Sequence, residues 1–190
     1  MRRHTIRFDS LYSARNRCVE VCGSLSGTGV IVETGLVFTN YHLIENGDDS
    51  SILVDGECVE QVIYFDFALD FAALKVVTKE VKPIAIQTKC WANQPVFYVG
   101  NPGEKVKAIQ LGRIKSCKTG QIEVVIDCEQ GFSGSGLYNL RGQLIGLTDS
   151  FDDEPAKNSG RNGYAIPGRN LADYLSFCRK KIARDQLLTG

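Results

Sequence analysis

One serine lies in a glycine-rich stretch whose residue types suit nucleophilic catalysis. Residues 131–136 read Gly-Phe-Ser-Gly-Ser-Gly and separate two apolar, strand-like runs. Glycine exposes the main chain and permits sharp turns, so backbone N–H groups can converge beside the Ser133 hydroxyl. The stretch predicts either a plain glycine-rich turn or a nucleophile at Ser133. In the second case, the amides of Gly131 and Ser133 would hold the developing oxyanion.

A serine nucleophile needs a general base, and the chain offers few. Its two histidines are His4, in the polar N-terminal segment, and His42, just past a predicted strand. We expect His4 at the surface and His42 as the base. A carboxylate must orient the imidazole, and both Asp66 and Asp70 precede an apolar run at 71–77. Asp70 adjoins that run and would be held more rigidly, so it is the expected partner.

The order of these residues along the chain selects a fold. The α/β-hydrolases place serine first, then the acid, then histidine, and no histidine follows His42 here. The order His42, Asp70, Ser133 is that of the chymotrypsin-like enzymes. Each residue could have a purely structural role, but the three together indicate a catalytic triad.

The elements that would position these residues are short strands. Apolar runs bounded by turn signals recur about every 8–12 residues, which is typical of an all-β sandwich or barrel. The runs are 18–22, 29–33, 36–40, 51–54, 59–65, 71–77, 95–100, 107–116, 121–127, 142–147 and 163–166. A polar stretch near 78–92 divides them into two sets of about six strands.

Only the C-terminal end is predicted to be helical. Apolar residues there recur at helical spacing. They are Leu171, Tyr174, Leu175, Cys178 and Ile182. Asn170 is a suitable N-cap, and the basic residues that follow suit the helix C-terminus and a solvated face. This helix closes the predicted architecture.

Five segments, in order, resemble one known family. They are "GTGVIVETGLVFTNYHLI" (27–44), "LVDGECVEQVIYFDFALDFAALKV" (53–76), "VFYVGNPG" (96–103), "GFSGSGLYNLRGQLIGL" (131–147) and "GYAIPGRNLADYL" (163–175). These segments are similar to the motifs of the trypsin-like serine peptidases, most closely the HtrA/Deg type. The resemblance covers roughly residues 17–178.

The resemblance implies a fold, an activity and a set of site residues. The fold would be all-β, a chymotrypsin-like double six-stranded β-barrel with a C-terminal α-helix. The activity would be serine endopeptidase, with protein or peptide substrates and no metal or organic cofactor. The expected units are an N-terminal tail (1–12), a first barrel with His42 and Asp70 (13–82), a second barrel with Ser133 (83–168), and the helix (169–190). Thr148, Tyr164, Ala165 and Asp127 would bind substrate.

Asp127 bears on specificity. In the trypsin-like register it lies six positions before Ser133, at the base of the primary pocket, where a carboxylate would favour Arg or Lys on the acyl side of the cut bond. The acidic run 152–154 would add long-range attraction. Alternatively, Asp127 only caps the strand end or pairs with a nearby Arg or Lys. HtrA-type enzymes usually prefer small aliphatic residues, and their loops align here with a two-residue gap, which would move Asp127 out of the pocket.

Two departures from the family pattern leave alternatives open. The family's G-N-S-G-G-P reads Gly-Phe-Ser-Gly-Ser-Gly here, and we expect a protease domain without the family's PDZ domain. Phe132 and Ser135 could misorder the oxyanion loop, so a pseudoprotease that binds peptides without cutting them is the alternative function. In the digestive trypsin-like enzymes, an aspartate at the position of Phe132 pairs with the N-terminal ammonium that proteolytic cleavage exposes. Phe132 cannot form this pair, so activity without N-terminal processing is expected. A virus-encoded chymotrypsin-like protease is an alternative origin.

Composition excludes several other classes. The formal net charge is zero and the pI about 6.7, which does not favour a nucleic-acid partner. No run is long and apolar enough for a signal peptide or a membrane span, so an intracellular protein is expected. The seven cysteines lack zinc-site spacing and are expected to be reduced and mostly buried. The oligomeric state is left open.

Overall fold

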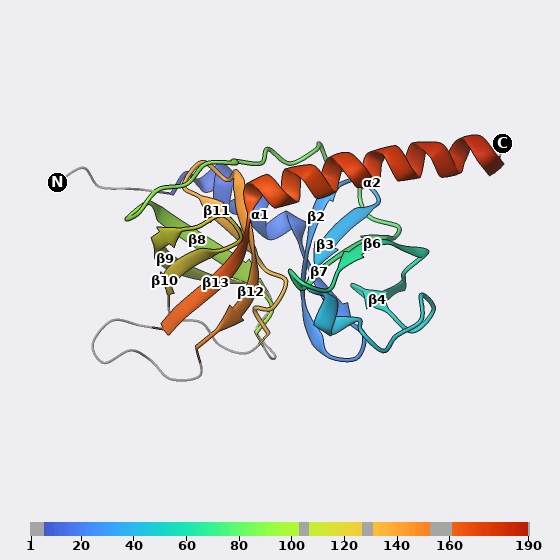
Figure 1. Ribbon diagram of the computed structural model, residues 1–190, viewed down its shortest axis with the longest axis horizontal. Helices are drawn as coiled ribbons and strands as arrows, with labels where there is room; N and C mark the ends of the chain where they lie inside the picture. The colour runs from blue at the N-terminus through green and yellow to red at the C-terminus, as the bar shows by residue number, and fades with distance from the viewer. Residues whose placement is uncertain (1–5, 103–106, 127–130, 153–160, 190) are drawn as a thin grey trace.

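Two β-units lie side by side, with one long helix across both (Figure 1). This computed structural model describes residues 6–102, 107–126, 131–152 and 161–189. The elements are α1 (Phe8–Arg17), β1 (Cys18–Cys22), β2 (Ser26–Glu33), β3 (Leu36–Thr39), η1 (Tyr41–Leu43), β4 (Leu53–Val54), β5 (Glu57–Cys58), β6 (Gln61–Asp66), β7 (Phe71–Lys75), β8 (Pro95–Gly100), β9 (Ala108–Cys117), β10 (Ile122–Ile126), β11 (Gly136–Asn139), β12 (Leu144–Phe151), β13 (Arg161–Pro167) and α2 (Gly168–Thr189).

The N-terminal unit is an antiparallel sheet of seven strands in the order β5-β4-β1-β2-β3-β7-β6. Its strands are rich in β-branched and aromatic residues, which fit a pleated, half-buried surface. One face covers a core of aliphatic residues that includes Val21, Ile31, Val37, Leu43 and Leu74. β3 and β7 are adjacent, so the segments that leave β3 and enter β7 come together at one end of the sheet.

The C-terminal unit is a closed barrel in the order β10-β13-β12-β11-β8-β9. All six of its neighbouring pairs are antiparallel. Closure leaves no free sheet edge, and the inward-facing side chains fill the interior. This core includes Tyr98, Ile114, Val124, Phe132 and Leu137.

The predicted fold class is confirmed, with one difference in the first unit. Its sheet is a half-barrel of seven strands, not a closed barrel of six. β4 and β5 have only two residues each, so they form too short a ladder to close the sheet against β6.

A second difference is α1, because a helix was expected only at the C-terminus. The buried face of α1 consists of Ser10, Ala14 and Arg17, with no large apolar side chain. The apolar periodicity that reveals α2 in the sequence is therefore missing from α1. Instead of apolar packing, α1 is held by hydrogen bonds from the Arg17 guanidinium to the carbonyls of Ile31 and Lys82.

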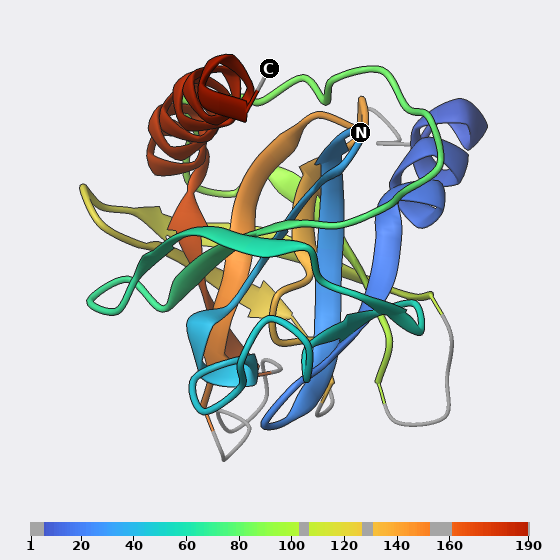
Figure 2. The same ribbon diagram turned by 90° about the vertical axis from the view of Figure 1, so that its right-hand side faces the viewer.

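Helix α2 fastens the two units together (Figure 1), and Figure 2 shows this helix nearly end-on beside the sheets. Leu171, Leu175 and Cys178 enter a core shared by both units. Polar bonds then tie the helix to the first sheet. The Tyr174 hydroxyl donates to Asp66 at 2.6 Å, and Arg179 pairs with Glu33 at 2.6 Å. Within the described residues, no helix is long and apolar enough to cross a membrane.

The expectation that all the cysteines are reduced is wrong for one pair. Cys90 and Cys117 form a disulfide with a Cα–Cα distance of 6.4 Å, within the usual range. The pairing was not visible in the sequence because 27 positions separate the two residues. Cys18, Cys22, Cys58 and Cys178 carry free thiols. Cys128 lies outside the described residues.

This disulfide predicts a response to reductant. Excess thiol is expected to lower Tm by roughly 6–15 °C, because a crosslink over such a loop contributes about 3–4 kcal/mol in the loop-entropy account. Thermal unfolding with and without dithiothreitol measures the change. The Cys90→Ser/Cys117→Ser variant is the control, and its Tm should be the same with and without the reductant. An equal response in both proteins would contradict the assignment.

Candidate active site

His42 and Asp70 meet where β3 ends and β7 begins. His42 lies in the short helix η1, directly after β3, and Asp70 is the last residue before β7. The His42 Nδ1 atom lies 2.6 Å from Asp70 Oδ2, a short hydrogen bond of the charge-assisted kind. The bond fixes the ring, so Nε2 is left to face a substrate. The expected His–Asp pair is therefore present.

Asp70 holds the main chain around His42 as well as its ring. Its other carboxylate oxygen accepts the His42 amide at 2.8 Å, and its carbonyl accepts the Tyr41 amide and the Asn40 side chain. Asp70 itself has φ +49°, a left-handed conformation that is strained for a non-glycine residue. Four bonds to one residue maintain this strained geometry.

The environment of His42 favours its protonated form. The hydrogen bond to Asp70 is the largest effect and raises the pKa of His42 above its ordinary value, against burial, which lowers it. The charges of Asp70, Asp149 and Glu45 raise it further. The imidazole side chain is still 34% exposed, so a substrate can reach it.

Ser133 lies in a tight turn between β10 and β11. Gly131 and Gly134 adopt positive φ angles of +96° and +78°, as the glycine-rich sequence predicts. An added Cβ at Gly134 would lie 2.0 Å from the Thr28 carbonyl oxygen, so this position requires glycine. The amides of Gly131 and Ser133 make no hydrogen bond to another described residue.

Thr28, in β2, brings the serine turn and the histidine strand together. Its amide donates to the Ser133 carbonyl and its hydroxyl donates to the Gly131 carbonyl, both at 2.8 Å. Its own carbonyl accepts the Thr39 hydroxyl, three residues before His42. One residue of the first sheet thus connects the two halves of the site.

Comparison with known families now identifies the chain. The sequence model of the trypsin-like peptidase domain matches residues 27–147, which include His42, Asp70 and Ser133. The chain belongs to this family.

Curated relatives of the peptidase domain include an anti-sigma factor as well as HtrA proteases. Anti-sigma-I factor RsgI9 of Acetivibrio thermocellus is 30% identical in an alignment 178 residues long that covers 85% of this chain and 24% of the relative. Serine protease Do-like HtrA of Lactococcus lactis subsp. lactis is 27% identical in an alignment 182 residues long that covers 80% of this chain and 44% of the relative. The chain therefore spans less than half the length of these two proteins.

Solved structures support the fold of the peptidase domain. The serine endoprotease from Yersinia pestis superposes with a TM-score of 0.75 at 23% identity, covering 90% of this chain and 65% of the other. At this identity the likeness shows the chymotrypsin-like fold.

The two departures in the serine turn of the peptidase domain have different consequences. Phe132 is fully buried in the core of the second barrel, so packing anchors the turn there. Ser135 is also fully buried, and its hydroxyl has no hydrogen-bond partner among the described residues. Gly100 makes room for both, because an added Cβ there would lie 2.2 Å from Ser135 Oγ and 2.7 Å from the Phe132 ring.

The residues expected to bind substrate occupy different positions in the peptidase domain. Thr148 is buried, and its amide and hydroxyl both donate to the Ser135 carbonyl, so it supports the serine turn. Ala165 is buried opposite Thr148, on β13. The Tyr164 hydroxyl donates to Asp152 at 3.1 Å. Asp127 lies outside the described residues, so its role stays a prediction.

Two residues at this site give no recognisable signal in the sequence. Thr28 lies in the quoted Gly-Thr-Gly motif, but a threonine in a strand gives no sign that it bridges two units. Asp149 follows Thr148 and interacts electrostatically with both His42 and Asp70. Its proximity depends on how the two units dock, which no local pattern reveals.

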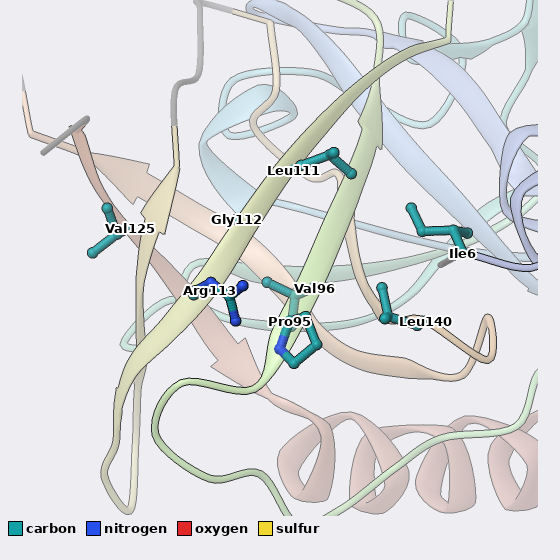
Figure 3. A pocket seen from close by; sticks show the side chains of 8 residues that line it. All are labelled: Ile6, Pro95, Val96, Leu111, Gly112, Arg113, Val125 and Leu140. Atoms are coloured by element: carbon teal, nitrogen blue, oxygen red, sulfur yellow. The ribbon is translucent and has the colours of Figure 1, made fainter. Parts of the chain in front are cut away.

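A separate hollow of the peptidase domain lies away from this site (Figure 3). It occupies the outer face of the second barrel, between β8 and β9. None of the residues of the candidate active site lines it. Its lining is mostly apolar and consists of Ile6, Pro95, Val96, Leu111, Gly112, Arg113, Val125 and Leu140. The candidate active site is therefore defined by hydrogen bonds and not by this hollow.

Proposed function

We propose that this chain is a serine endopeptidase that hydrolyses peptide bonds of protein or peptide substrates with His42, Asp70 and Ser133. The 2.6 Å bond between His42 Nδ1 and Asp70 Oδ2 carries the proposal. With its proton held on Nδ1, a neutral His42 keeps a free lone pair on Nε2, which is the state that a general base requires. The relatives named as serine proteases support the same activity.

The first half of the reaction forms an acyl-enzyme. Ser133 Oγ attacks the scissile carbonyl carbon while His42 Nε2 takes the hydroxyl proton. The carbonyl oxygen becomes an oxyanion and accepts hydrogen bonds from the amides of Gly131 and Ser133. Collapse of this intermediate breaks the C–N bond, and His42 gives its proton to the leaving amine. Asp70 stays ionised and stabilises the imidazolium.

The second half releases the product. A water molecule gives a proton to His42 Nε2 and attacks the acyl carbon, and the same two amides hold the new oxyanion. Collapse of this second intermediate breaks the bond between the acyl carbon and Ser133 Oγ and releases the carboxylic acid product. His42 returns the proton to Ser133 Oγ as that bond breaks, which restores the free enzyme. Among the described residues no hydrogen bond joins Ser133 to His42, and catalytic bonds of this kind often tighten only when substrate binds.

A fluorophosphonate probe tests the proposal directly. The probe reacts with a serine hydroxyl only when a base activates it and donors hold the phosphonyl oxygen. One equivalent is expected to bind to the folded wild-type protein, at Ser133, and intact-mass and peptide mass spectrometry report the site.

Matched variants separate the possible outcomes. Ser135→Ala should be labelled like wild type, whereas Ser133→Ala and His42→Ala should stay unlabelled with an unchanged circular-dichroism spectrum. An unlabelled, folded wild-type protein would contradict the proposal and favour a pseudoprotease that only binds peptides.

A further inference from the structure

Asp149 stands at the junction between the serine turn and the His–Asp pair. In the β12–β13 ladder, Thr148 lies opposite Ala165 and Ser150 opposite Tyr164, so Asp149 is the extra residue of a β-bulge. A bulge turns a side chain away from the regular alternation of a strand. The residue before Asp149 is also fixed, because the Thr148 carbonyl accepts the Gly134 amide at 3.3 Å. The bulge is therefore anchored against the serine turn.

The Asp149 carboxylate is half-buried and makes no hydrogen bond to another described residue. Among the described residues, its charged neighbours are Asp70 and His42, both from the first unit. Burial, and then the charge of Asp70, raise the pKa of Asp149 to about 6, and His42 opposes them. This carboxylate therefore weakens the fold when ionised, and unpaired charges of this kind concentrate at functional sites.

We propose that Asp149 is a positioning residue for His42, a second carboxylate that favours the imidazolium formed when Ser133 gives up its proton. The inference rests on the proposed function. Asp70 already uses both carboxylate oxygens on the ring and amide of His42, whereas Asp149 acts through space. Among the described residues, Glu45, just after η1, is the other acidic group that acts on His42, and its exposed side chain is screened by solvent.

The sign of the effect on His42 follows from the charges. Ionised Asp149 raises the pKa of His42, so removing the charge should lower that pKa and extend activity to more acidic pH. Because His42 and Asp149 interact, the two apparent pKa values of their titration describe the pair and not either residue alone. Ionised Asp149 should also speed catalysis at neutral pH, where imidazolium formation accompanies proton transfer.

Rate profiles of Asp149→Asn provide the first test. Its kcat/KM for a chromogenic peptide, measured from pH 5 to 9, should show an acid limb about 0.5–1 pH unit lower than wild type. At pH 8, kcat should fall about 3–10-fold, the rate equivalent of that shift, with KM little changed. Asp149→Glu should restore the wild-type limb. Asp173→Asn, which removes one exposed charge from α2, should leave both quantities unchanged.

A measurement that needs no turnover separates this inference from the proposed function. The chain has only two histidines, so NMR titration of the imidazole C–H signals, assigned with His42→Ala, gives the pKa of His42 directly. That pKa should drop by about 0.5–1 unit in Asp149→Asn. A drop without any hydrolysis by wild type would sink the proposed function alone.

Thermal unfolding adds a second independent reading. A group whose pKa is raised in the folded state contributes stability that is fully present below its ordinary pKa of 3.8 and lost as pH rises through about 6. Asp149→Asn should therefore raise Tm at pH 8 and leave it nearly unchanged at pH 4. Active wild-type enzyme with an unshifted His42 pKa and an unshifted acid limb in Asp149→Asn would overturn the inference.

Discussion

Replacing Ser133 with alanine is expected to lower kcat for an unfolded protein such as casein by about 10⁴–10⁶-fold. The Ser133 side chain makes no hydrogen bond to another described residue, so the fold should not depend on it. The carbonyl of Ser133 stays bonded to the Thr28 amide, which keeps the turn in place. Gel-based cleavage and thermal unfolding measure the two quantities, and His42→Ala should behave in the same way.

Ser135→Ala is the matched control for this experiment. It also deletes a serine hydroxyl, two residues further along the chain. This hydroxyl is buried and has no hydrogen-bond partner among the described residues. Activity should stay within about threefold of wild type, and the free energy of unfolding should rise by about 1 kcal/mol, because a buried hydroxyl without a partner is removed. If Ser135→Ala were inactive and Ser133→Ala active, the nucleophile would have been misassigned.

Asp70→Asn is expected to lower kcat by about 10⁴-fold while the fold persists. The asparagine oxygen can still accept the His42 amide, so the backbone of η1 keeps its support. Its NH₂ group would face Nδ1 and favour the wrong imidazole tautomer. The pKa of His42 should fall as well, because the bond to Asp70 is the main cause of its rise.

Asp66→Asn tests the other acidic residue of the same turn. The Asp66 carboxylate accepts the Leu69 amide and the Tyr174 hydroxyl, so it joins α2 to the first sheet and does not orient His42. We expect a lower Tm with kcat within about threefold of wild type. A loss of activity comparable to that of Asp70→Asn would contradict this division of roles.

The sequence predicted what depends on local pattern. Short apolar runs with turn signals indicated an all-β chain, and β8 begins and ends where the run 95–100 does. Asp70 was preferred over Asp66 because it adjoins an apolar run, and the structure places Asp70 against His42. The glycines flanking Ser133 indicated positive φ angles, which Gly131 and Gly134 adopt.

What escaped prediction depends on contacts between distant segments. Helix α1 packs through Ser10 and Ala14, whose small side chains produce no apolar period. Cys90 and Cys117 could be paired only once β8–β9 and their flanking segments were placed in space. Phe132 resembled a defect in a catalytic motif, yet it fills the second barrel, because the core behind the turn is apolar in this chain.

The position of Thr28 has a consequence for biosynthesis. Thr28, His42 and Asp70 all leave the ribosome long before Ser133, and Thr28 must bond to both Gly131 and Ser133 before the turn is fixed. It must also receive the Asn101 amide on its hydroxyl. A nascent or half-folded chain therefore holds a histidine and an aspartate without an aligned nucleophile. The ability to cut peptides would therefore arise only in the last stage of folding. Other copies of the chain that are still unfolded would then be protected from cleavage by partly folded ones.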